Sequence, residues 1–463
     1  MDIIINILLK IFAFIFAICL SILVHEFCHF WMARRLGVKV LSFSIGFGKP
    51  FYKWTGKDGT IYMLAPFLIG GYVKMLESTT ADKKFSNKKH LFFDKKPLAH
   101  RAAIVIAGAF GNFILAIFFF WLVFSIGMEM PKTIIGKIEP NSKAAQAQLL
   151  SGDEIISINQ NTTHSWSDVI LEMLPFFGEK DKFPIAVKRD NQIITKPNIF
   201  TFANWNPDFY KTDPLKDLGI MPYHPILPAI IDNIKPDSPA AKFKLQKGDK
   251  IIVLDKQPIK NWDEFMESIK KRPNQTFFIK IERHKKILQL PITSGWRLGE
   301  DWEKIGYLGI SPLYVKWPVN TTFIEKYNPF SALPKALQQS SKFCHFNLLL
   351  FQKILTGKIS LHMLGGPLMI FQSASSALQQ GFLVYLRFLA ILNTTLVLAN
   401  LLPIPGLDGG YFIFLTYEAI RRKPLSARSQ LLFYRLGIIF LIIVMIQAMV
   451  NDLMRIVGNF KLY

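Results

Sequence analysis

The chain has 463 residues, of which 51% are hydrophobic, and its formal net charge is +22. The apolar residues gather toward both ends and leave a polar, Lys-rich middle over residues 128–328, so we expect a membrane protein with an inserted soluble part. The positive charge is concentrated beside the apolar segments, which argues against nucleic acid as a partner. The three cysteines lie outside the middle, which excludes a disulfide framework there.

Four apolar segments approach the roughly 20 residues that a helix needs to cross a bilayer. The first is read as an uncleaved span, because no small-x-small cleavage site follows it. A fifth apolar segment, residues 343–355, is short and interrupted, so we expect an amphipathic helix at the membrane surface. The four predicted spans are residues 11–32, 102–126, 382–402 and 431–450.

Basic residues flank these spans on one side. Positive charge beside a span marks the cytoplasmic side, so we expect both termini and the long middle insert on the opposite side. The insert is itself basic, but long domains cross the membrane largely regardless of charge. The flanking residues are Arg34, Arg35, Lys39, Lys95, Lys96, Arg101, Arg421, Arg422, Lys423 and Arg428.

The middle insert repeats itself. Residues 138–160 match residues 234–256 at a constant offset of 96, which predicts two tandem domains of similar fold. Segments 218–222 and 307–312 flank the second copy, and we expect both to be strands that close it. The matched pairs include Ser142 with Ser238, Gly152 with Gly248, Asp153 with Asp249 and Trp166 with Trp262.

The first predicted span contains the motif H-E-F-C-H. On a helix, His25 and His29 lie at i and i+4 on one face, where both can bind one Zn²⁺. Glu26 can then accept a proton from water at the metal. Cys28 falls on another face and is read as an inert buried thiol. Ionisable residues inside a span usually face a functional interior, so we interpret the cluster as a metal site.

A catalytic zinc site usually takes a third protein ligand. The residues after His29 offer none nearby, and the next glutamate is Glu77. A candidate stands at the end of the third span, where "ANLLPIPGLDGG" (residues 399–410) carries Asp408 in an apolar stretch. Its prolines break the helix, and irregular backbone at membrane depth is tolerated only where protein or a water-filled cavity satisfies it.

The H-E-x-x-H motif, paired with N-x-x-P-x-P-x-L-D-G, resembles the site-2 protease family of intramembrane zinc metalloproteases. The two inserted domains carry a P-x-S-x-A-A…L-x-x-G-D-x-I signature that is similar to that of bacterial PDZ domains. Two such domains between spans two and three narrow the resemblance to site-2 proteases of the bacterial regulator of sigma-E protease group. The resemblance covers nearly the whole chain, including "GFGKP" (residues 46–50) and "GGYVKM" (residues 70–75). One departure is Ala109, where the family usually has proline.

By this resemblance, His25, His29 and Asp408 would ligate Zn²⁺, and Glu26 would be the general base. Asn400 would contact the substrate backbone or the oxyanion; hydrogen bonding to the broken-helix backbone is an equally open role. A membrane-associated β-loop would pair with an extended substrate, although packing alone would also explain that loop. The residues of the loop that we expect to bind substrate are Gly70, Gly71, Tyr72, Val73 and Lys74.

The predicted fold is therefore a polytopic α-helical membrane protein with about four transmembrane helices, a membrane-associated β-loop and two tandem α+β PDZ domains inserted between spans two and three. The predicted parts are residues 1–127 (N-terminal membrane part), 128–225 and 226–315 (PDZ domains), 316–380 (interfacial segment) and 381–463 (C-terminal membrane part).

The resemblance implies a protease of the bacterial inner membrane, with periplasmic PDZ domains and an active site toward the cytoplasm. It would cut single-span proteins after a first protease has removed their outer domain; typical substrates are an anti-sigma factor and signal-peptide remnants. The PDZ pair would exclude bulky substrates or sense the new C-terminus, and either copy can equally be read as a spacer without an open groove. The alternatives from other classes are a non-enzymatic PDZ scaffold with a degenerate metal site, and a transporter, for which duplicated helix halves are lacking.

Overall fold

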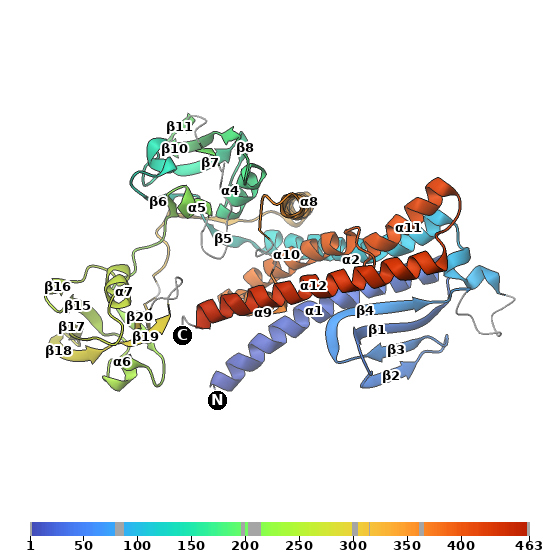
Figure 1. Cartoon of the computed structure of the whole chain (residues 1–463). Coiled ribbons are helices and arrows are strands. Elements are labelled where there is room, and N and C mark those ends of the chain that lie inside the picture. Colours follow the sequence, from blue (N-terminus) through green and yellow to red (C-terminus); the bar gives the residue numbers. More distant parts are fainter. Residues whose placement is uncertain are drawn as a thin grey trace. The chain divides into compact units, whose positions relative to one another are not determined.

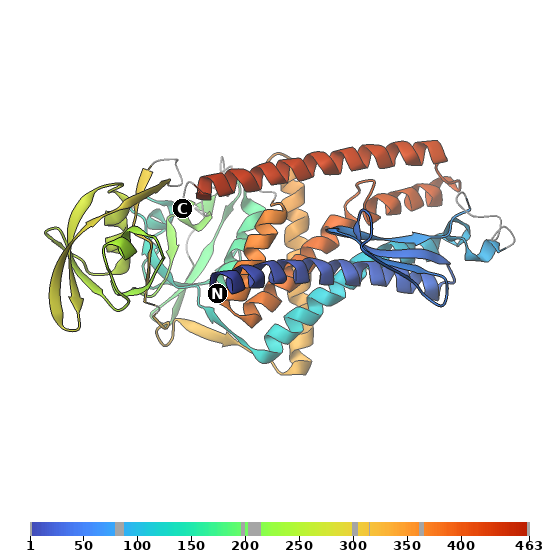
Figure 2. The ribbon, with the colours of Figure 1, turned by 90° about the horizontal axis from the view of Figure 1, so that it is seen from below.

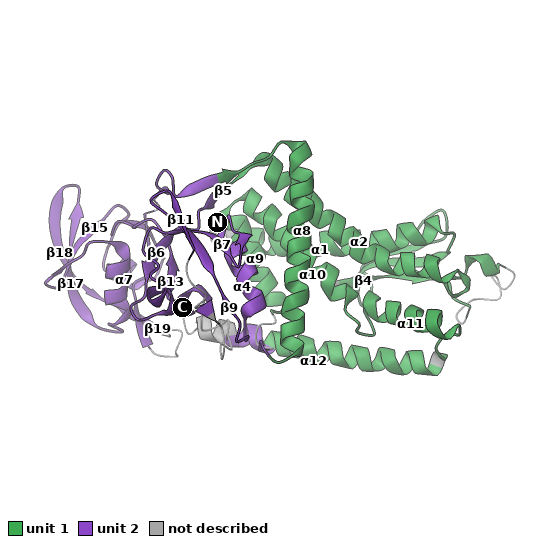
Figure 3. Ribbon diagram, turned by 90° about the horizontal axis from the view of Figure 1, so that it is seen from above, with its two compact units in different colours: residues 1–129, 324–357, 364–449 green, residues 130–323, 358–363, 450–463 purple. Residues whose placement is uncertain are grey.

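The computed structural model describes residues 2–78, 88–195, 200–201, 214–298, 304–313, 315–360 and 365–460. The parts of the predicted domains that fall in the gaps lie outside the described residues. The chain divides into two compact units (Figure 3). Unit 1 comprises residues 1–129, 324–357 and 364–449, and unit 2 comprises residues 130–323, 358–363 and 450–463.

Unit 1 is built mainly from long helices (Figure 1). Among the described residues, four helical stretches are long and apolar enough to cross a membrane: Ile7–Arg35, Leu98–Ile126, Phe382–Leu401 and Arg428–Met454. They coincide with the four predicted spans, and the crossing itself stays a prediction. The helices are α1 (Asp2–Arg35), α2 (Leu98–Ile126), α8 (Pro329–Leu355), α9 (Pro367–Gln380), α10 (Phe382–Leu401), α11 (Asp408–Arg421) and α12 (Ala427–Phe460), with short 3-10 turns η2 (Lys89–Leu91) and η3 (Phe93–Lys95).

A four-stranded sheet follows α1 in the chain and lies beside the C-terminal part of that helix (Figure 2). Its strand order is β2-β3-β1-β4, so β2 and β4 form its edges. β4 runs antiparallel to β1, and β3 runs parallel to β1. The strands are β1 (Val40–Phe47), β2 (Tyr52–Thr55), β3 (Ile61–Leu64) and β4 (Phe67–Met75). The predicted β-loop is therefore an edge strand.

One apolar cluster joins the sheet to three helices. It contains residues of α1, β1, α2 and α11, and removing this apolar surface from water holds the four elements together. Its buried members are Phe30, Ala33, Val38, Val40, Phe43, Phe93, Ile104, Val105 and Leu415. The helix that carries H-E-x-x-H and the helix that begins at Asp408 thus share one core.

Unit 2 contains the predicted repeat. In both copies a strand is followed by a short helix, two strands, a longer helix and an antiparallel strand pair, as the predicted duplication requires, and each copy has further short elements of its own. The first copy comprises β6 (Ile135–Ile138), α3 (Lys143–Gln146), β7 (Glu154–Ile158), β8 (Asn161–Thr162), α4 (Trp166–Met173), η4 (Leu174–Phe176), β9 (Lys182–Phe183), β10 (Ile185–Arg189), β11 (Gln192–Thr195), β12 (Phe200–Thr201), α5 (Pro214–Asp217) and β13 (Ile220–Pro222). The second comprises β14 (Ile231–Ile234), α6 (Pro239–Lys242), β15 (Lys250–Leu254), β16 (Gln257–Pro258), α7 (Trp262–Lys270), β17 (Thr276–Arg283), β18 (Lys286–Thr293), β19 (Gly295–Leu298), β20 (Lys304–Tyr307) and β21 (Ile310–Pro312). Strands β5 (Met128–Pro131) and β22 (Thr322–Glu325) lie where the chain passes between the units.

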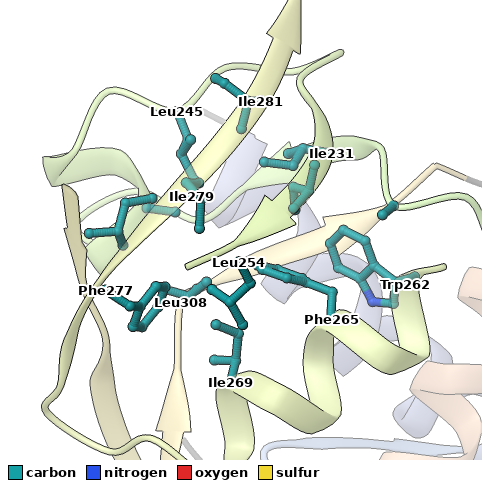
Figure 4. Packing of buried hydrophobic residues seen from close by; sticks show 14 residues of the cluster. Ile231, Leu245, Leu254, Trp262, Phe265, Ile269, Phe277, Ile279, Ile281 and Leu308 are labelled. Atoms are coloured by element: carbon teal, nitrogen blue, oxygen red, sulfur yellow. The ribbon is translucent and has the colours of Figure 1, made fainter. Parts of the chain in front are cut away.

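The repeated Ser and Gly-Asp residues make equivalent contacts in both copies. Ser142 and Ser238 cap α3 and α6 by accepting the backbone N–H of the third helical residue. The buried carboxylates of Asp153 and Asp249 each form a two-pronged ion pair, with Arg189 and with Arg283 respectively. The second copy encloses its own apolar core around α7 and β17 (Figure 4).

The prediction that both flanking strands close the second copy is wrong for residues 218–222. β13 pairs with β6 of the first copy, whereas β21 pairs with β14 of the second. Each copy ends in its own Leu-Gly-Ile segment, and the backbone bonds repeat: Glu139 N–H donates to Gly219 O, and Lys235 N–H donates to Gly309 O. Each copy is thus closed by its own last strand.

Candidate metal centre

His25, Glu26 and His29 lie in the C-terminal third of α1, which is an unbroken helix from Asp2 to Arg35. The spacing places the two imidazoles on one face, with ring centroids 4.7 Å apart and Nε2 atoms 3.1 Å apart. Glu26 and His29 are each only 7% exposed. The predicted pairing of the two histidines is therefore present in a site shielded from solvent.

Asp408 is the first residue of α11 and meets both histidines. Its Oδ2 atom lies 3.3 Å from His25 Nε2 and 3.3 Å from His29 Nε2. The chain leaves helix α10 at Leu401 and turns through Gly406, which has φ +106°, before α11 begins. That conformation favours glycine, because a side chain would clash with the backbone. The Pro- and Gly-rich segment thus aims the carboxylate back at α1.

The three donor atoms fit a zinc ion. They all lie within 4.8 Å of one another. Tetrahedral zinc with nitrogen and oxygen ligands at about 2.0–2.1 Å needs neighbouring ligand atoms about 3.3 Å apart, which matches the observed spacing. The buried Asp408 Oδ2 forms no hydrogen bond with any described residue, although two imidazole nitrogens lie beside it. A carboxylate oxygen aimed at two imidazole nitrogens is the donor set of a cation site.

The second nitrogen of His29 is held by the backbone of α2. His29 Nδ1 lies 2.8 Å from the carbonyl oxygen of Ile104, and a carbonyl can only accept, so Nδ1 carries the proton. This tautomer leaves the Nε2 lone pair free for a metal. The prediction missed Ile104, because a backbone carbonyl leaves no signature in the residue type.

His25 has a weaker partner. Its Nδ1 lies 3.4 Å from Asn400 Nδ2, at the end of α10. The structure thus brings Asn400 to the edge of the candidate site, beside an imidazole. The oxygen and nitrogen of an amide are interchangeable by a half-turn, so Asn400 can also present its oxygen to a protonated Nδ1.

Gly108 of α2 provides the space that the two imidazoles occupy. A Cβ atom at this position would lie 2.6 Å from His25 Cε1 and would also overlap His29 Nε2. One turn further, Gly111 lies against Cys28, so this cysteine packs on α2 rather than beside the three donor atoms. The sequence did contain a signal for Gly108. A glycine in the middle of a helix destabilises that helix, so its presence in an apolar helix indicates a position where packing leaves no room for a side chain.

The predicted loop residues Gly70, Gly71, Tyr72, Val73 and Lys74 all lie in β4. A Cβ at Gly71 would lie 2.7 Å from Glu26 Cγ and 2.6 Å from Ser44 O, so β4 passes directly beside the candidate base. Tyr72 is 38% exposed and stacks on Phe47. The structure therefore brings the edge strand to Glu26.

The sequence matches a known protein family over most of its length. The profile of "Peptidase family M50" matches residues 13–444. The chain is 36% identical to "Regulator of sigma-E protease RseP" of Salmonella typhimurium over 97% of this chain and 100% of that protein. It is 36% identical to the protein of the same name from Escherichia coli, over 96% of this chain and 98% of that protein. "Protease RseP" of Yersinia pestis is also 36% identical, over 97% and 100%.

A solved PDZ domain of the SdrC-like protein from Listeria innocua matches 19% of this chain and 97% of that chain, with 26% identity and a TM-score of 0.17. This score is too low to support a statement about the fold. The family match extends over nearly the whole chain and includes H-E-x-x-H and Asp408. The chain belongs to peptidase family M50.

Proposed function

We propose that this chain is an intramembrane zinc endopeptidase of the site-2 type. The observation that carries the proposal is the convergence of His25 Nε2, His29 Nε2 and Asp408 Oδ2 at 3.1–3.3 Å. The two histidines lie on one of the four helices long enough to cross a membrane, and Asp408 begins a shorter helix. His25, His29 and Asp408 would hold Zn²⁺. A zinc ion bound there supplies a Lewis acid and lowers the pKa of a coordinated water to about 7.

Glu26 is the general base of the proposed reaction. It is buried beside His25, and β4 passes along its side chain at Gly71. Its carboxylate takes a proton from the attacking water and then delivers that proton to the amide nitrogen of the departing peptide. Asn400, next to His25, is placed either to orient the imidazole or to donate to the oxygen of the scissile carbonyl.

β4 is the proposed docking strand for substrate. A helical substrate hides its carbonyls in its own hydrogen bonds, so cleavage requires local unwinding, and strand addition supplies replacement bonds. β4 has one strand neighbour, β1, and its other edge is open among the described strands. A peptide added along Gly70–Lys74 would run past Glu26, which supports the assignment of these residues to substrate binding.

The two repeats of unit 2 are proposed to be tandem PDZ domains, residues 128–225 and 226–315. β13 and β21 each pair with a single strand in the described part of the chain, which leaves an edge where an extended peptide can add. The proposed substrates are single-span membrane proteins, including an anti-sigma factor after a first cut and signal-peptide remnants, and the PDZ pair would exclude those with bulky outer domains.

The proposed location is the bacterial inner membrane, with four spans, α8 at the membrane surface and the repeats in the periplasm. The support is the cluster of basic residues at one end of the apolar helices, among them Arg34 and Arg35 at the end of α1. Both follow H-E-x-x-H closely, and this supports a candidate site that lies toward the cytoplasmic side.

The direct test is cleavage of a single-span protein with a short outer tail by the purified full-length chain, compared with Glu26→Gln. We expect product with the wild type, none with the variant, and equal zinc content in both. Full-rate cleavage by Glu26→Gln would overturn the proposal. Appending a folded outer domain to the same substrate tests the size filter: cleavage should fall, whereas changing only the terminal residue of a short tail should leave it unchanged.

A further inference from the structure

The metal donors come from two separate helices, so the position of one helix must be fixed relative to the other. His25 and His29 lie on α1, and Asp408 begins α11. α2 packs against both helices. We propose that the ion pair between Arg101 of α2 and Glu418 of α11 is a positioning pair, which sets Asp408 against the two histidines. The inference rests on the proposed zinc site.

One face of α2 carries all the contacts concerned. Arg101, Ile104 and Gly108 are spaced i, i+3 and i+7, and this spacing lines them up along a helix. Ile104 O accepts from His29 Nδ1, and Gly108 makes room for both imidazoles. The same face that fixes the histidines therefore also holds the ion pair to α11.

The ion pair is two-pronged, and its arginine makes a third hydrogen bond. Arg101 Nη1 donates to Glu418 Oε2 at 3.0 Å, and Nη2 donates to Oε1 at 2.6 Å. Arg101 Nε donates to the carbonyl oxygen of Lys96 at 3.1 Å, so the guanidinium is held from both sides. The side chains of Arg101 and Glu418 are 9% and 17% exposed. A fork of this kind defines both distance and orientation.

The rest of the contact between α2 and α11 does not supply that definition. Ile104, Val105 and Leu415 belong to one apolar cluster, with Tyr411 packed against it. Apolar contact is non-directional, so it sets the rotation of a helix less sharply than a two-pronged ion pair does. Buried ion pairs add little net stability, and their best-attested use is to select one arrangement among several. Here the ion pair selects one rotation of α11 about its axis and one position along that axis.

The ion pair acts on Asp408 through the helix. Glu418 lies ten residues after Asp408 in α11, a distance of about 15 Å along the axis. The other end of α11 begins just after Gly406, in a backbone conformation open to few other residues. Because α11 is rigid between these two points, a rotation of the helix at Glu418 moves the Asp408 carboxylate away from both Nε2 atoms. No hydrogen bond or ion pair joins Arg101 or Glu418 to any of the three metal donors among the described contacts, and the pair acts only through Asp408.

The test measures zinc affinity of the full-length chain in detergent, by competition with a chromophoric chelator. Arg101→Lys keeps the charge but loses the fork, and Glu418→Gln keeps the shape but loses the charge. We expect either variant to bind zinc about tenfold or more weakly, as is typical when a residue that orients a metal ligand is changed. The exchanged pair, Arg101→Glu with Glu418→Arg, should bind zinc more tightly than either Arg101→Glu or Glu418→Arg alone.

The matched control is Lys335→Ala, which removes the ion pair of α8 with Glu325 in the same unit, where the two side chains are 22% and 20% exposed. It should leave zinc affinity at the wild-type value. Wild-type affinity in both Arg101→Lys and Glu418→Gln would overturn the inference, as would an equal loss in Lys335→Ala. A wild-type chain that binds no zinc would instead overturn the proposed function, so the two failures are distinguishable.

Discussion

Asp408 Oδ2 lies 3.3 Å from His29 Nε2, and these two atoms come from opposite ends of the chain. The contact depends on three features: the fixed tautomer of His29, the turn through Gly406 before α11, and the absence of a side chain at Gly108. A substitution that alters one of these features should therefore change zinc binding.

Gly108→Ala should weaken zinc binding. The added Cβ would lie 2.6 Å from His25 Cε1 and overlap the His29 ring, which the bond to Ile104 O prevents from turning away. We expect zinc affinity to fall about tenfold or more, because the ligands lose their orientation. Gly111→Ala is the matched control: its Cβ meets Cys28 instead, so it should lower stability and retain zinc. Equal zinc affinity in Gly108→Ala and wild type would contradict this account.

Gly71→Ala should slow cleavage without releasing zinc. Its Cβ would lie 2.6 Å from Ser44 O and 2.7 Å from Glu26 Cγ, so β4 or Glu26 must shift. A displacement of about 1 Å at a catalytic group can cost about 100-fold in rate, and we expect kcat to fall toward that extent. Gly70→Ala meets only the exposed ring of Phe47 and should lose less. Steady-state kinetics with zinc analysis checks this, and loss of zinc in Gly71→Ala would speak against it.

Arg283→Met should destabilise the second repeat. Asp249 is 1% exposed, and without Arg283 its buried carboxylate lacks its cationic partner. Removal of one member of a buried pair costs about 3–5 kcal/mol, and the partial exposure of Arg283 places the expected loss near the lower end. Hydrogen exchange at the Gln246 amide, which donates to Asp249 Oδ2, reports the change. Lys271→Ala, which removes a solvent-exposed ion pair with Glu267, should leave the exchange of the Gln246 amide unchanged.

Low pH should destabilise the same repeat through protonation of Asp255. The hydrogen bond from the Phe278 backbone N–H, followed by the ion pair with Arg272, lowers the pKa of Asp255 from its ordinary value of 3.8. Because the folded pKa lies below the unfolded one, this contribution to stability is present above pH 3.8 and disappears as the pH falls below it. Hydrogen exchange at Phe278 should accelerate in that range, and Asp255→Asn should remove the dependence.

The sequence predicted the parts of the site that a local period or a motif defines. The i, i+4 spacing places His25 and His29 together on any helix, and the family motif pointed to Asp408. The residues that support them escaped prediction for a physical reason. Ile104 acts through its carbonyl, Gly108 through the side chain that it lacks, and Arg101 through a partner more than 300 residues away. Residues 218–222 were assigned to the wrong repeat because strand pairing depends on contacts distant in the chain.

The zinc content and zinc affinity of the purified chain test the central claim most directly, with wild type, Glu26→Gln and Asp408→Asn compared in parallel. The account predicts about one zinc per chain in the first two, since Glu26 is a base and not a ligand. Asp408→Asn removes the charged donor beside His25 and His29 and should bind zinc far more weakly. Equal zinc content and affinity in Asp408→Asn and wild type would contradict the account.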